Sequence, residues 1–286
     1  MISSATFIGF IAIVLWSCLA LMTAASGTVP PFQLAAMTFA IGGTCGLIYA
    51  VARGELSAFR QPWPVWLLGV GGLFGYHALY FAALRLAPPA EAGLIAYLWP
   101  LLIVLFSSLL PGEHLVLRQV IGGILGFAGV IVLFYGKSSG SFALDPHSFT
   151  GYGLALACAF VWSTYSVLSR RVKEVPTSAV AGFCLATALF AAISHMLFET
   201  TTWPANAGQW LAVLALGLGP VGLAFYVWDH GVKRGDIKLL GVASYAAPVL
   251  STLILVVTGF ANASWALALA CALIVGGAMV ASYKRA

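Results

Sequence analysis

The sequence predicts an all-helical integral membrane protein with ten transmembrane helices, arranged as two inverted sets of five. Three observations predict this class. The chain is 62% hydrophobic and only 7% charged, whereas a soluble domain carries about 25% charged residues. Ten apolar runs of about 20 residues follow one another, and a helix of that length spans the roughly 30 Å hydrocarbon core. Motifs of the first half also return in the second half.

The ten expected spans are separated by short links that carry prolines and glycines. We expect helices at residues 6–24, 32–51, 64–86, 91–110, 118–136, 151–170, 178–198, 208–231, 237–258 and 264–283. The longest link, between Gly136 and Thr150, is polar and rich in Gly and Ser. It divides the chain into a first repeat at 1–137, a connecting loop at 138–149 and a second repeat at 150–286.

The distribution of basic residues predicts the direction in which the helices run. If the N-terminus is cytoplasmic, the cytoplasmic segments hold eleven of the thirteen Lys and Arg residues, and the outer loops hold only Arg85 and Lys137. Both termini are therefore expected in the cytoplasm. No Lys or Arg precedes the first apolar run, so we expect a retained first helix and not a cleaved signal peptide.

Two motifs recur in the same order in both halves. Trp16 in the first run returns as Trp162 in the sixth run, and the segment Tyr97–Pro100 returns as Tyr245–Pro248. Because each repeat has five helices, an odd number, the second repeat must run upside down relative to the first. Inverted repeats are typical of secondary transporters, whose substrate site lies near the membrane midplane between the halves.

Pro100 and Pro248 are expected to interrupt helices inside the membrane. A proline has no N–H and frees the carbonyl four residues back, here those of Ala96 and Ser244. Lipid cannot donate a hydrogen bond, so a partner helix, a water or a ligand must do so. We therefore expect paired half-sites at the two breaks, with Pro100 and Pro248 as hinges at which the helices bend.

Several aromatic residues lie far from either membrane face. Trp and Tyr in membrane proteins ordinarily form belts at the interfaces, and a buried indole or phenol needs a hydrogen-bond partner. A shared substrate cavity explains why so many of these residues lie near the membrane centre. For any single one of them, packing between helices is the alternative. The residues that we expect to line the substrate site are Trp16, Tyr76, His77, Tyr80, Tyr97, Trp99, Trp162, Ser244 and Tyr245.

His77 is the only ionisable residue clearly in the middle of a span, and Tyr76 and Tyr80 share its part of the helix. An ionisable residue inside a membrane is expected to be functional, and a neutral histidine bonded to a backbone carbonyl is the alternative. No carboxylate occupies the membrane centre, and Asp229 is expected to pair with Lys233. Proton-coupled and facilitated transport are both compatible with this pattern.

A cavity of Trp, Tyr, His and Ser favours an amino acid with an apolar or aromatic side chain. Aromatic walls stack on rings and attract an ammonium group by about 0.5–2 kcal/mol. The hydroxyls of Tyr97, Ser244 and Tyr245 are expected to hold the carboxylate. No buried Arg is placed to bind phosphate, which argues against nucleotide-sugars and phosphorylated sugars.

No catalytic residue, cofactor, metal or nucleic-acid partner is expected. The sequence has no HExxH motif and no paired carboxylates at the midplane, and its five cysteines lie in apolar runs without CxxC spacing. The net charge of +5 is spread over the loops, without a long basic run. A broad drug or metabolite exporter is the main alternative, and an intramembrane enzyme is the alternative from another class.

Three segments carry a resemblance to a known family: Ile8–Ser17, Tyr97–Pro100 and Gly241–Ser251. Together with the inverted repeat, they resemble the drug/metabolite transporter superfamily in its EamA-type branch, and within it the bacterial exporters of aromatic amino acids. The resemblance covers essentially the whole chain. It implies export of aromatic and other neutral amino acids across the bacterial inner membrane by alternating access. The partners are then a small-molecule substrate and lipid, and the chain could act as a monomer.

Overall fold

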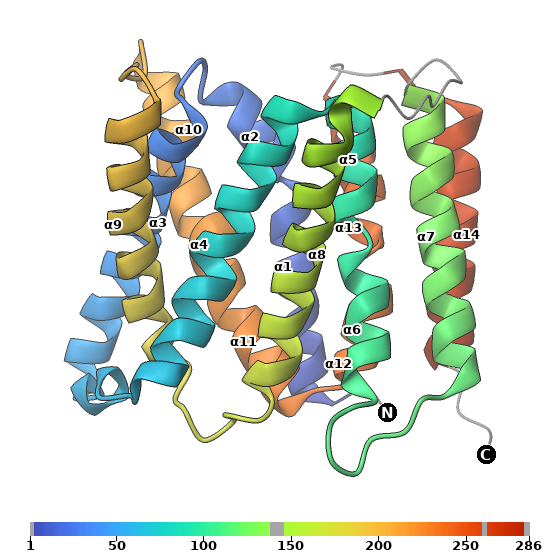
Figure 1. The fold of residues 1–286 in the computed structure, drawn as a ribbon, viewed down its shortest axis with the longest axis horizontal. Coiled ribbons are helices and arrows are strands. Elements are labelled where there is room, and N and C mark those ends of the chain that lie inside the picture. The colour runs from blue at the N-terminus through green and yellow to red at the C-terminus, as the bar shows by residue number, and fades with distance from the viewer. Residues whose placement is uncertain (1–2, 138–145, 259–261, 283–286) are drawn as a thin grey trace.

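The computed structural model describes residues 3–137, 146–258 and 262–282 (Figure 1). Within these ranges every regular element is a helix, and the helices stand side by side in one bundle (Figure 1). Eight helical segments are long and apolar enough to cross a membrane, and the shorter apolar helices Glu91–Ser107 and Trp265–Ala281 accompany them. The prediction of an all-helical membrane protein is confirmed.

The helices alternate in direction through the bundle (Figure 1). The first half contains α1 (Ser4–Ser17), α2 (Leu19–Ala25), α3 (Pro31–Ala52), η1 (Leu56–Phe59), α4 (Trp63–Leu86), α5 (Pro89–Ala96), α6 (Trp99–Ser107) and α7 (Leu117–Lys137). The second half contains η2 (Pro146–Ser148), α8 (Phe149–Ser169), α9 (Ala179–Phe198), α10 (Ala207–Leu218), η3 (Gly219–Leu223), α11 (Ala224–Arg234), α12 (Ile237–Ala243), α13 (Ala246–Val257) and α14 (Trp265–Ser282).

The start of α1 and the end of α14 lie at the same end of the bundle (Figure 1). We call this the terminal end and the other the distal end. Most of the predicted connecting loop, residues 138–145, and the basic residues Lys284 and Arg285 lie outside the described residues.

Local sequence explains where several helices begin. Prolines occupy the first turn of α3, α4 and α5, where the backbone N–H would have no helical partner in any case. The side chain of Asn206 accepts a hydrogen bond from the N–H of Gln209 before α10, and Asp236 accepts one from Leu239 at α12. Such caps satisfy N–H groups that the helix leaves unpaired.

The expected breaks at Pro100 and Pro248 are confirmed. Helix α5 ends at Ala96 and α6 begins at Trp99, directly before Pro100. Helix α12 ends at Ala243 and α13 begins at Ala246, two residues before Pro248. Two further interruptions were not predicted, because the expected spans 6–24 and 208–231 were taken as continuous: α1 and α2 meet at Cys18, and η3 separates α10 from α11.

The element η3 is a single π-helical turn that contains Pro220. Glycines allow its backbone to pack tightly. A Cβ on Gly222 would lie 2.1 Å from the carbonyl oxygen of Gly217, and a Cβ on Gly42 of α3 would lie 2.6 Å from the Cα of Gly222. The π-turn therefore lies directly on the backbone of α3. Turns of this kind are frequent at functional sites.

The main helix pairs each join one helix from the first half to one from the second. Helix α1 packs on α11, α3 on α9, α4 on α8 and α7 on α14. The pair of α7 and α14 stands at one edge of the bundle (Figure 1). A Cβ on Gly122 would lie 2.5 Å from the carbonyl oxygen of Gly277, so these two helices approach closely through small residues.

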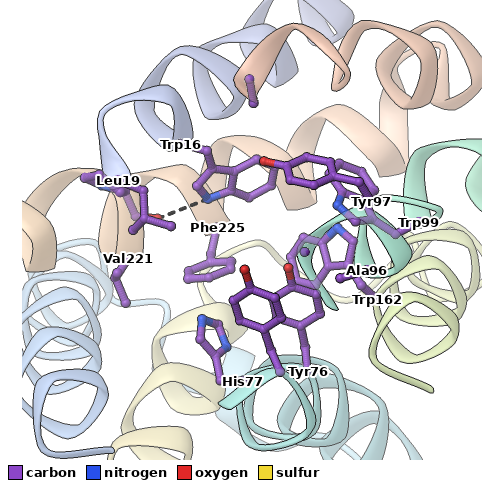
Figure 2. A pocket seen from close by; sticks show the side chains of 14 residues that line it. Trp16, Leu19, Tyr76, His77, Ala96, Tyr97, Trp99, Trp162, Val221 and Phe225 are labelled. Atoms are coloured by element: carbon purple, nitrogen blue, oxygen red, sulfur yellow. Dashed lines mark hydrogen bonds between the residues drawn. The ribbon is translucent and has the colours of Figure 1, made fainter. Parts of the chain in front are cut away.

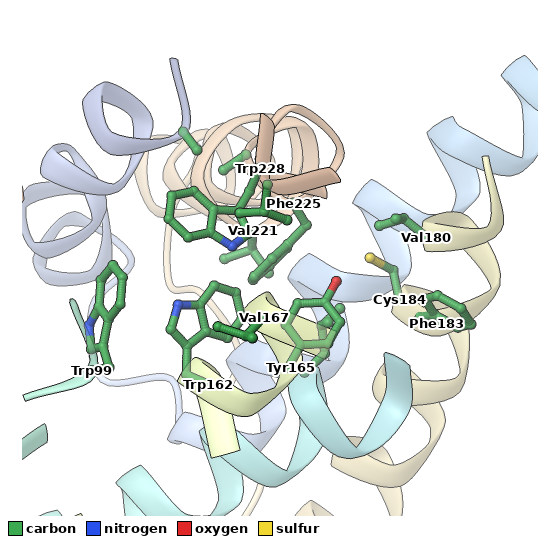
Figure 3. Close-up of a cluster of buried hydrophobic side chains, with 14 of the residues drawn as sticks. Trp99, Trp162, Tyr165, Val167, Val180, Phe183, Cys184, Val221, Phe225 and Trp228 are labelled. Atoms are coloured by element: carbon green, nitrogen blue, oxygen red, sulfur yellow. The ribbon is translucent and has the colours of Figure 1, made fainter. Parts of the chain in front are cut away.

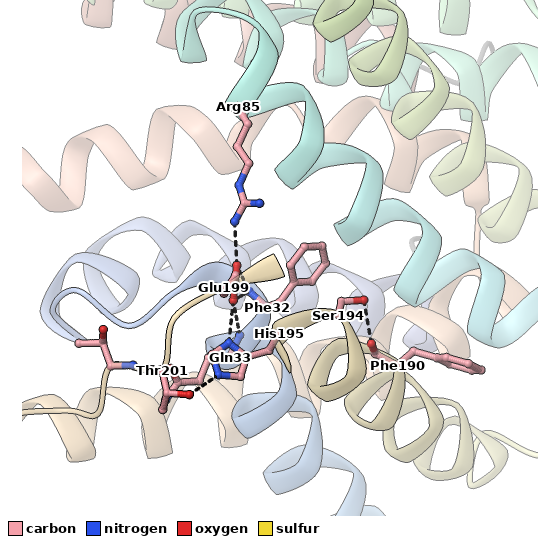
Figure 4. Close-up of polar contacts among 9 residues, drawn as sticks. Phe32, Gln33, Arg85, Phe190, Ser194, His195, Glu199 and Thr201 are labelled. Carbon is pink, nitrogen blue, oxygen red and sulfur yellow. Dashed lines mark hydrogen bonds and ion pairs between the residues drawn. The ribbon is translucent and has the colours of Figure 1, made fainter. Parts of the chain in front are cut away.

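A buried carboxylate joins three helices at the distal end (Figure 4). Glu199, after α9, accepts hydrogen bonds from the backbone N–H groups of Phe32 and Gln33 at the start of α3. It also forms an ion pair at 3.0 Å with Arg85 of α4, and it lies 3.0 Å from the Nδ1 of His195. A negative charge at a helix N-terminus stabilises the helix, and here it fixes α3 to α4 and α9.

The terminal end is closed by a second polar layer. Asp229 and Lys233 form the predicted ion pair at 2.8 Å, with both side chains almost fully buried. Thr177 donates a hydrogen bond to Asp229, and Lys233 donates one to the carbonyl of Val175. The end of α11 is thereby fixed to the segment that precedes α9.

Candidate functional site

A cavity of about 150 Å³ lies between the two halves of the chain, at the level of the helix breaks (Figure 2). Its walls come from α1, α2, α4, α5, α6, α8, η3, α11 and α13 and from the turn that holds Tyr97. The lining residues are Trp16, Leu19, Tyr76, His77, Tyr80, Gly93, Ala96, Tyr97, Trp99, Trp162, Pro220, Val221, Phe225 and Ala247.

The structure brings together seven of the nine residues expected at the substrate site. They are Trp16, Tyr76, His77, Tyr80, Tyr97, Trp99 and Trp162, and all of them line this cavity. Figure 2 shows Tyr76 and His77, both from α4, on the side opposite Trp16 and Tyr97. The rings of Tyr76 and Tyr80 are stacked, with centroids 6.0 Å apart.

Four tryptophans from four helices pack together on the terminal side of the cavity, and three of them, Trp16, Trp99 and Trp162, line it. Trp16 lies 5.6 Å from Trp162 and 5.1 Å from Trp228 between ring centroids. Trp228 stacks on Trp162 at 6.2 Å and meets Trp99 edge-on at 5.9 Å. Figure 3 shows Trp99, Trp162 and Trp228 together with Phe225 in this packed cluster. We call the four residues the tryptophan floor.

The tryptophan floor is held by two indole hydrogen bonds. The Nε1 of Trp16 donates to the carbonyl oxygen of Pro220 at 3.1 Å, drawn as a dashed line in Figure 2. The Nε1 of Trp228, a fully buried residue, donates to the Oγ of Ser166 at 3.1 Å. Pro220 lies in the π-turn η3, so this turn presents a backbone acceptor to the cavity wall.

His77 has the hydrogen bond to a backbone carbonyl that one of its two alternatives describes. Its Nδ1 lies 2.7 Å from the carbonyl oxygen of Leu73, one turn earlier in α4, and must donate because a carbonyl only accepts. The ring otherwise meets the aromatic rings of Phe39, Tyr76 and Phe225, with centroids 5.1–6.3 Å away. No carboxylate forms an ion pair with His77 among the residues that the structure describes.

Ser244 and Tyr245 do not line the cavity, contrary to expectation. Both are fully buried. The Oγ of Ser244 donates to the carbonyl of Leu240 in its own helix. The hydroxyl of Tyr245 accepts a hydrogen bond from the N–H of Leu101, and its ring packs on Phe127. Of the second Tyr-x-x-Pro segment Ala247 lines the cavity, but only the first segment turns its tyrosine into it.

Sequence reasoning missed the contribution of η3 and α11. Val221, Phe225 and Trp228 are spaced four and three residues apart, which is the spacing of one helix face. Val221 and Phe225 line the cavity, and Trp228 completes the tryptophan floor. This spacing was a signal that could have identified them.

The side chains that line the cavity include none with a full charge at neutral pH apart from the titratable His77. No Asp, Glu, Lys or Arg is among its lining residues. What it offers is stacked rings, the phenol groups of Tyr76, Tyr80 and Tyr97, and the Ala96 carbonyl, to which Pro100 has no N–H to donate. In the described part of the chain, no cluster of three His, Cys, Asp or Glu residues could hold a metal ion.

Comparison with known proteins identifies the family. The model of the EamA-like transporter family matches residues 3–135 and again residues 149–283. The chain belongs to the EamA-like transporter family. The two EamA matches cover nearly the whole chain.

Among EamA relatives, an aromatic amino acid exporter YddG from Ancylobacter novellus is 64% identical over 281 residues, which are 98% of this chain and 97% of the relative. The aromatic amino acid exporter YddG from Salmonella typhimurium is 29% identical and covers 87% of this chain and 86% of its own. A solved structure, "Crystal structure of protein", shares 63% identity with a TM-score of 0.95, covering 99% of this chain and 97% of that one. This EamA chain is a membrane transporter and not an enzyme.

Proposed function

We propose that this chain exports aromatic amino acids across the bacterial inner membrane. The single observation that carries the proposal is the uncharged cavity walled by Trp, Tyr, His and Phe rings. Rings of this kind bind an aromatic side chain by stacking and an ammonium by cation–π attraction. The 64% identity to a relative named as an exporter of aromatic amino acids supports the same substrate class.

The proposed architecture has ten transmembrane helices with both termini in the cytoplasm. The ten apolar segments and the eleven basic residues of the inward loops support it. The repeats are residues 1–137 and 150–286, joined by the loop 138–149, and the second repeat is inverted. Two successive matches of one family model support this division. The proposed functional unit is a monomer.

Transport proceeds by alternating access of the cavity, with Pro100 and Pro248 as hinges. Leu19, Tyr80 and Gly93 extend the cavity toward the distal end, the proposed outer side. The tryptophan floor and the Asp229–Lys233 pair close the way to the terminal end. These features support an outward-facing arrangement. In this arrangement the substrate can leave to the outside while the tryptophan floor stays closed.

A broad drug or metabolite exporter is the second candidate, because a protein named as a pseudopaline exporter, CntI from Pseudomonas aeruginosa, is 29% identical over 70% of this chain. The cavity of about 150 Å³ argues against it, since sites for drug-sized ligands occupy about 300–1,000 Å³. A cavity of this volume fits one molecule of the size of an amino acid.

Counterflow of labelled phenylalanine into liposomes tests the proposal. Purified protein should exchange phenylalanine, tyrosine and tryptophan faster than alanine, and a quaternary ammonium drug should not compete. Trp99→Ala should slow exchange, whereas Trp203→Ala, an exposed residue away from the cavity, should not. Equal rates for the two variants would show that the cavity is not the site, and exchange of the drug alone would favour the second candidate.

A further inference from the structure

A second cavity, of about 880 Å³, lies between α3, the loop before α9 and the rod formed by α10, η3 and α11. None of its lining residues lines the aromatic cavity. We call it the glycine groove, because Gly42, Gly46 and Gly217 lie along it. The proposed transport cycle assigns it no role.

The glycine groove has the length of one membrane leaflet. It begins at Gly42, midway along α3, and reaches Glu55 beyond the terminal end of that helix. At 1.5 Å per residue, α3 rises about 15 Å from Gly42 to its end at Ala52. The hydrocarbon part of one leaflet is also about 15 Å thick, because the whole hydrocarbon core is roughly 30 Å. A groove that runs from the midplane to one membrane face matches a lipid molecule better than a small polar substrate.

The inner part of the groove is apolar and open to the side. Cys45 of α3 is exposed, and Leu218 and Leu223 of the facing rod are 47% and 49% exposed. Tyr226 turns its polar atom away from the space, because its hydroxyl donates to the carbonyl of Gly42 at 3.0 Å. A Cβ on Gly46 would collide with Tyr226, so the glycine is what allows this wall to form.

The groove ends in two charged side chains of opposite sign. Arg234 is exposed and donates to the Nδ1 of His230 at 3.0 Å. Glu55 accepts a hydrogen bond from the Oγ of Ser178. Within the described ranges, neither Arg234 nor Glu55 forms an ion pair. Both charges are therefore available to a ligand that carries a cation and an anion.

We propose that the glycine groove binds a phospholipid whose headgroup carries a primary amine. The acyl chain lies along Gly42 and Gly46, the phosphate accepts hydrogen bonds from Arg234, and the ammonium donates to Glu55. Charge-assisted hydrogen bonds of this kind are short and strong, and basic pockets between membrane helices are recognised phosphate sites of lipids. A headgroup without an amine leaves Glu55 unpaired, and a choline headgroup has no N–H to donate.

Native mass spectrometry of the whole purified protein tests this site. The protein is mixed with equal amounts of phosphatidylethanolamine and phosphatidylcholine, and the retained lipid is measured. We expect phosphatidylethanolamine to be retained in preference. Arg234→Gln should weaken retention about tenfold, the effect of losing one charge-assisted hydrogen bond. Glu55→Gln should remove the preference between the two lipids while retention itself persists.

Two matched variants complete the test. Arg53→Gln removes an exposed charge near the end of α3 that does not line the groove, and it should retain lipid as the parent does. Cys45→Trp fills the apolar part from an exposed position and should displace the lipid. Equal retention by Arg234→Gln and Arg53→Gln overturns the proposal. So does equal retention of the two lipids by the parent, or a second copy of the chain that occupies the groove in place of lipid.

Discussion

The phenol oxygen of Tyr245 accepts a hydrogen bond from the backbone N–H of Leu101 at 3.2 Å. This bond joins the two proline breaks, because Leu101 directly follows Pro100 and Tyr245 begins the segment that leads to Pro248. The N–H of Leu101 lies in the first turn of α6, directly after the break from α5, so it has no acceptor one turn earlier in a continuous helix. One tyrosine of the repeated motif thus supports the break of the other half.

Tyr245→Phe should lower stability without changing substrate affinity. The variant leaves the Leu101 N–H without its partner inside the protein, which costs about 1–3 kcal/mol. Its apparent unfolding temperature in detergent should fall, while the KM for phenylalanine stays at the parent value because Tyr245 is outside the cavity. Tyr97→Phe is the matched control, since it should leave stability intact and raise KM. A raised KM for Tyr245→Phe would show that this residue belongs to the substrate site.

Trp16→Phe should slow transport about tenfold. The variant retains an aromatic ring on the tryptophan floor but loses the N–H that bonds the Pro220 carbonyl. A lost hydrogen bond of about 1.4 kcal/mol corresponds to a factor of ten. Initial rates of phenylalanine counterflow give the measurement. Trp66→Phe, at a residue that packs on Phe183 away from the cavity, should keep the parent rate; equal slowing of both variants would show a general effect of losing an indole.

Glu199→Gln should destabilise the distal end. The carboxylate, which is 2% exposed, accepts two backbone N–H groups of α3 and pairs with Arg85 and His195. Neutralising it weakens these bonds, and we expect a loss of about 1–3 kcal/mol. Thermal unfolding in detergent measures the loss. Glu174→Gln, at an exposed residue of a terminal-end loop, should unfold at the same temperature as the parent. If the unfolding curves of all three proteins coincide, Glu199 does not stabilise the distal end.

His77→Gln should leave the pH profile of transport unchanged between about pH 5 and 8, the range in which histidines change charge. The imidazole donates to Leu73 and meets aromatic rings, and no carboxylate of the described residues forms an ion pair with it, so we expect no proton exchange there during transport. Glutamine retains an N–H that reaches the same carbonyl. Counterflow rates over this range test the expectation, and a pH dependence that disappears in the variant would assign proton coupling to His77.

Depth in the membrane could be predicted from the sequence, but the direction of a side chain around its helix could not. The apolar runs predicted most helix ends to within a few residues, and the prolines predicted the breaks before Pro100 and Pro248. Seven aromatic and histidine residues chosen for depth do line one cavity. Tyr97 and Tyr245 have the same depth and the same motif, yet packing turns one inward to the cavity and the other onto Leu101.

The π-turn also escaped prediction, for a different physical reason. A run such as 208–231 has the same hydrophobicity whether its hydrogen bonds follow the α or the π pattern. The choice depends on Gly42 of α3, whose missing side chain lets the wide turn approach. That contact joins residues far apart in the chain. The roles of Pro220 and Phe225 therefore became visible only with the helices placed together.

A π-turn contains one residue more than an uninterrupted α-helix needs. The wide turn takes up that residue locally, because its five residues complete about the rotation and rise of four α-helical residues. Deleting a single residue from η3 would therefore let α10 and α11 run as one regular rod, with Phe225 and Trp228 still beside Trp162. What the deletion removes is the widened backbone that presents the Pro220 carbonyl to Trp16. A change of one residue in the length of this rod thus separates that hydrogen bond from the packing of the rings.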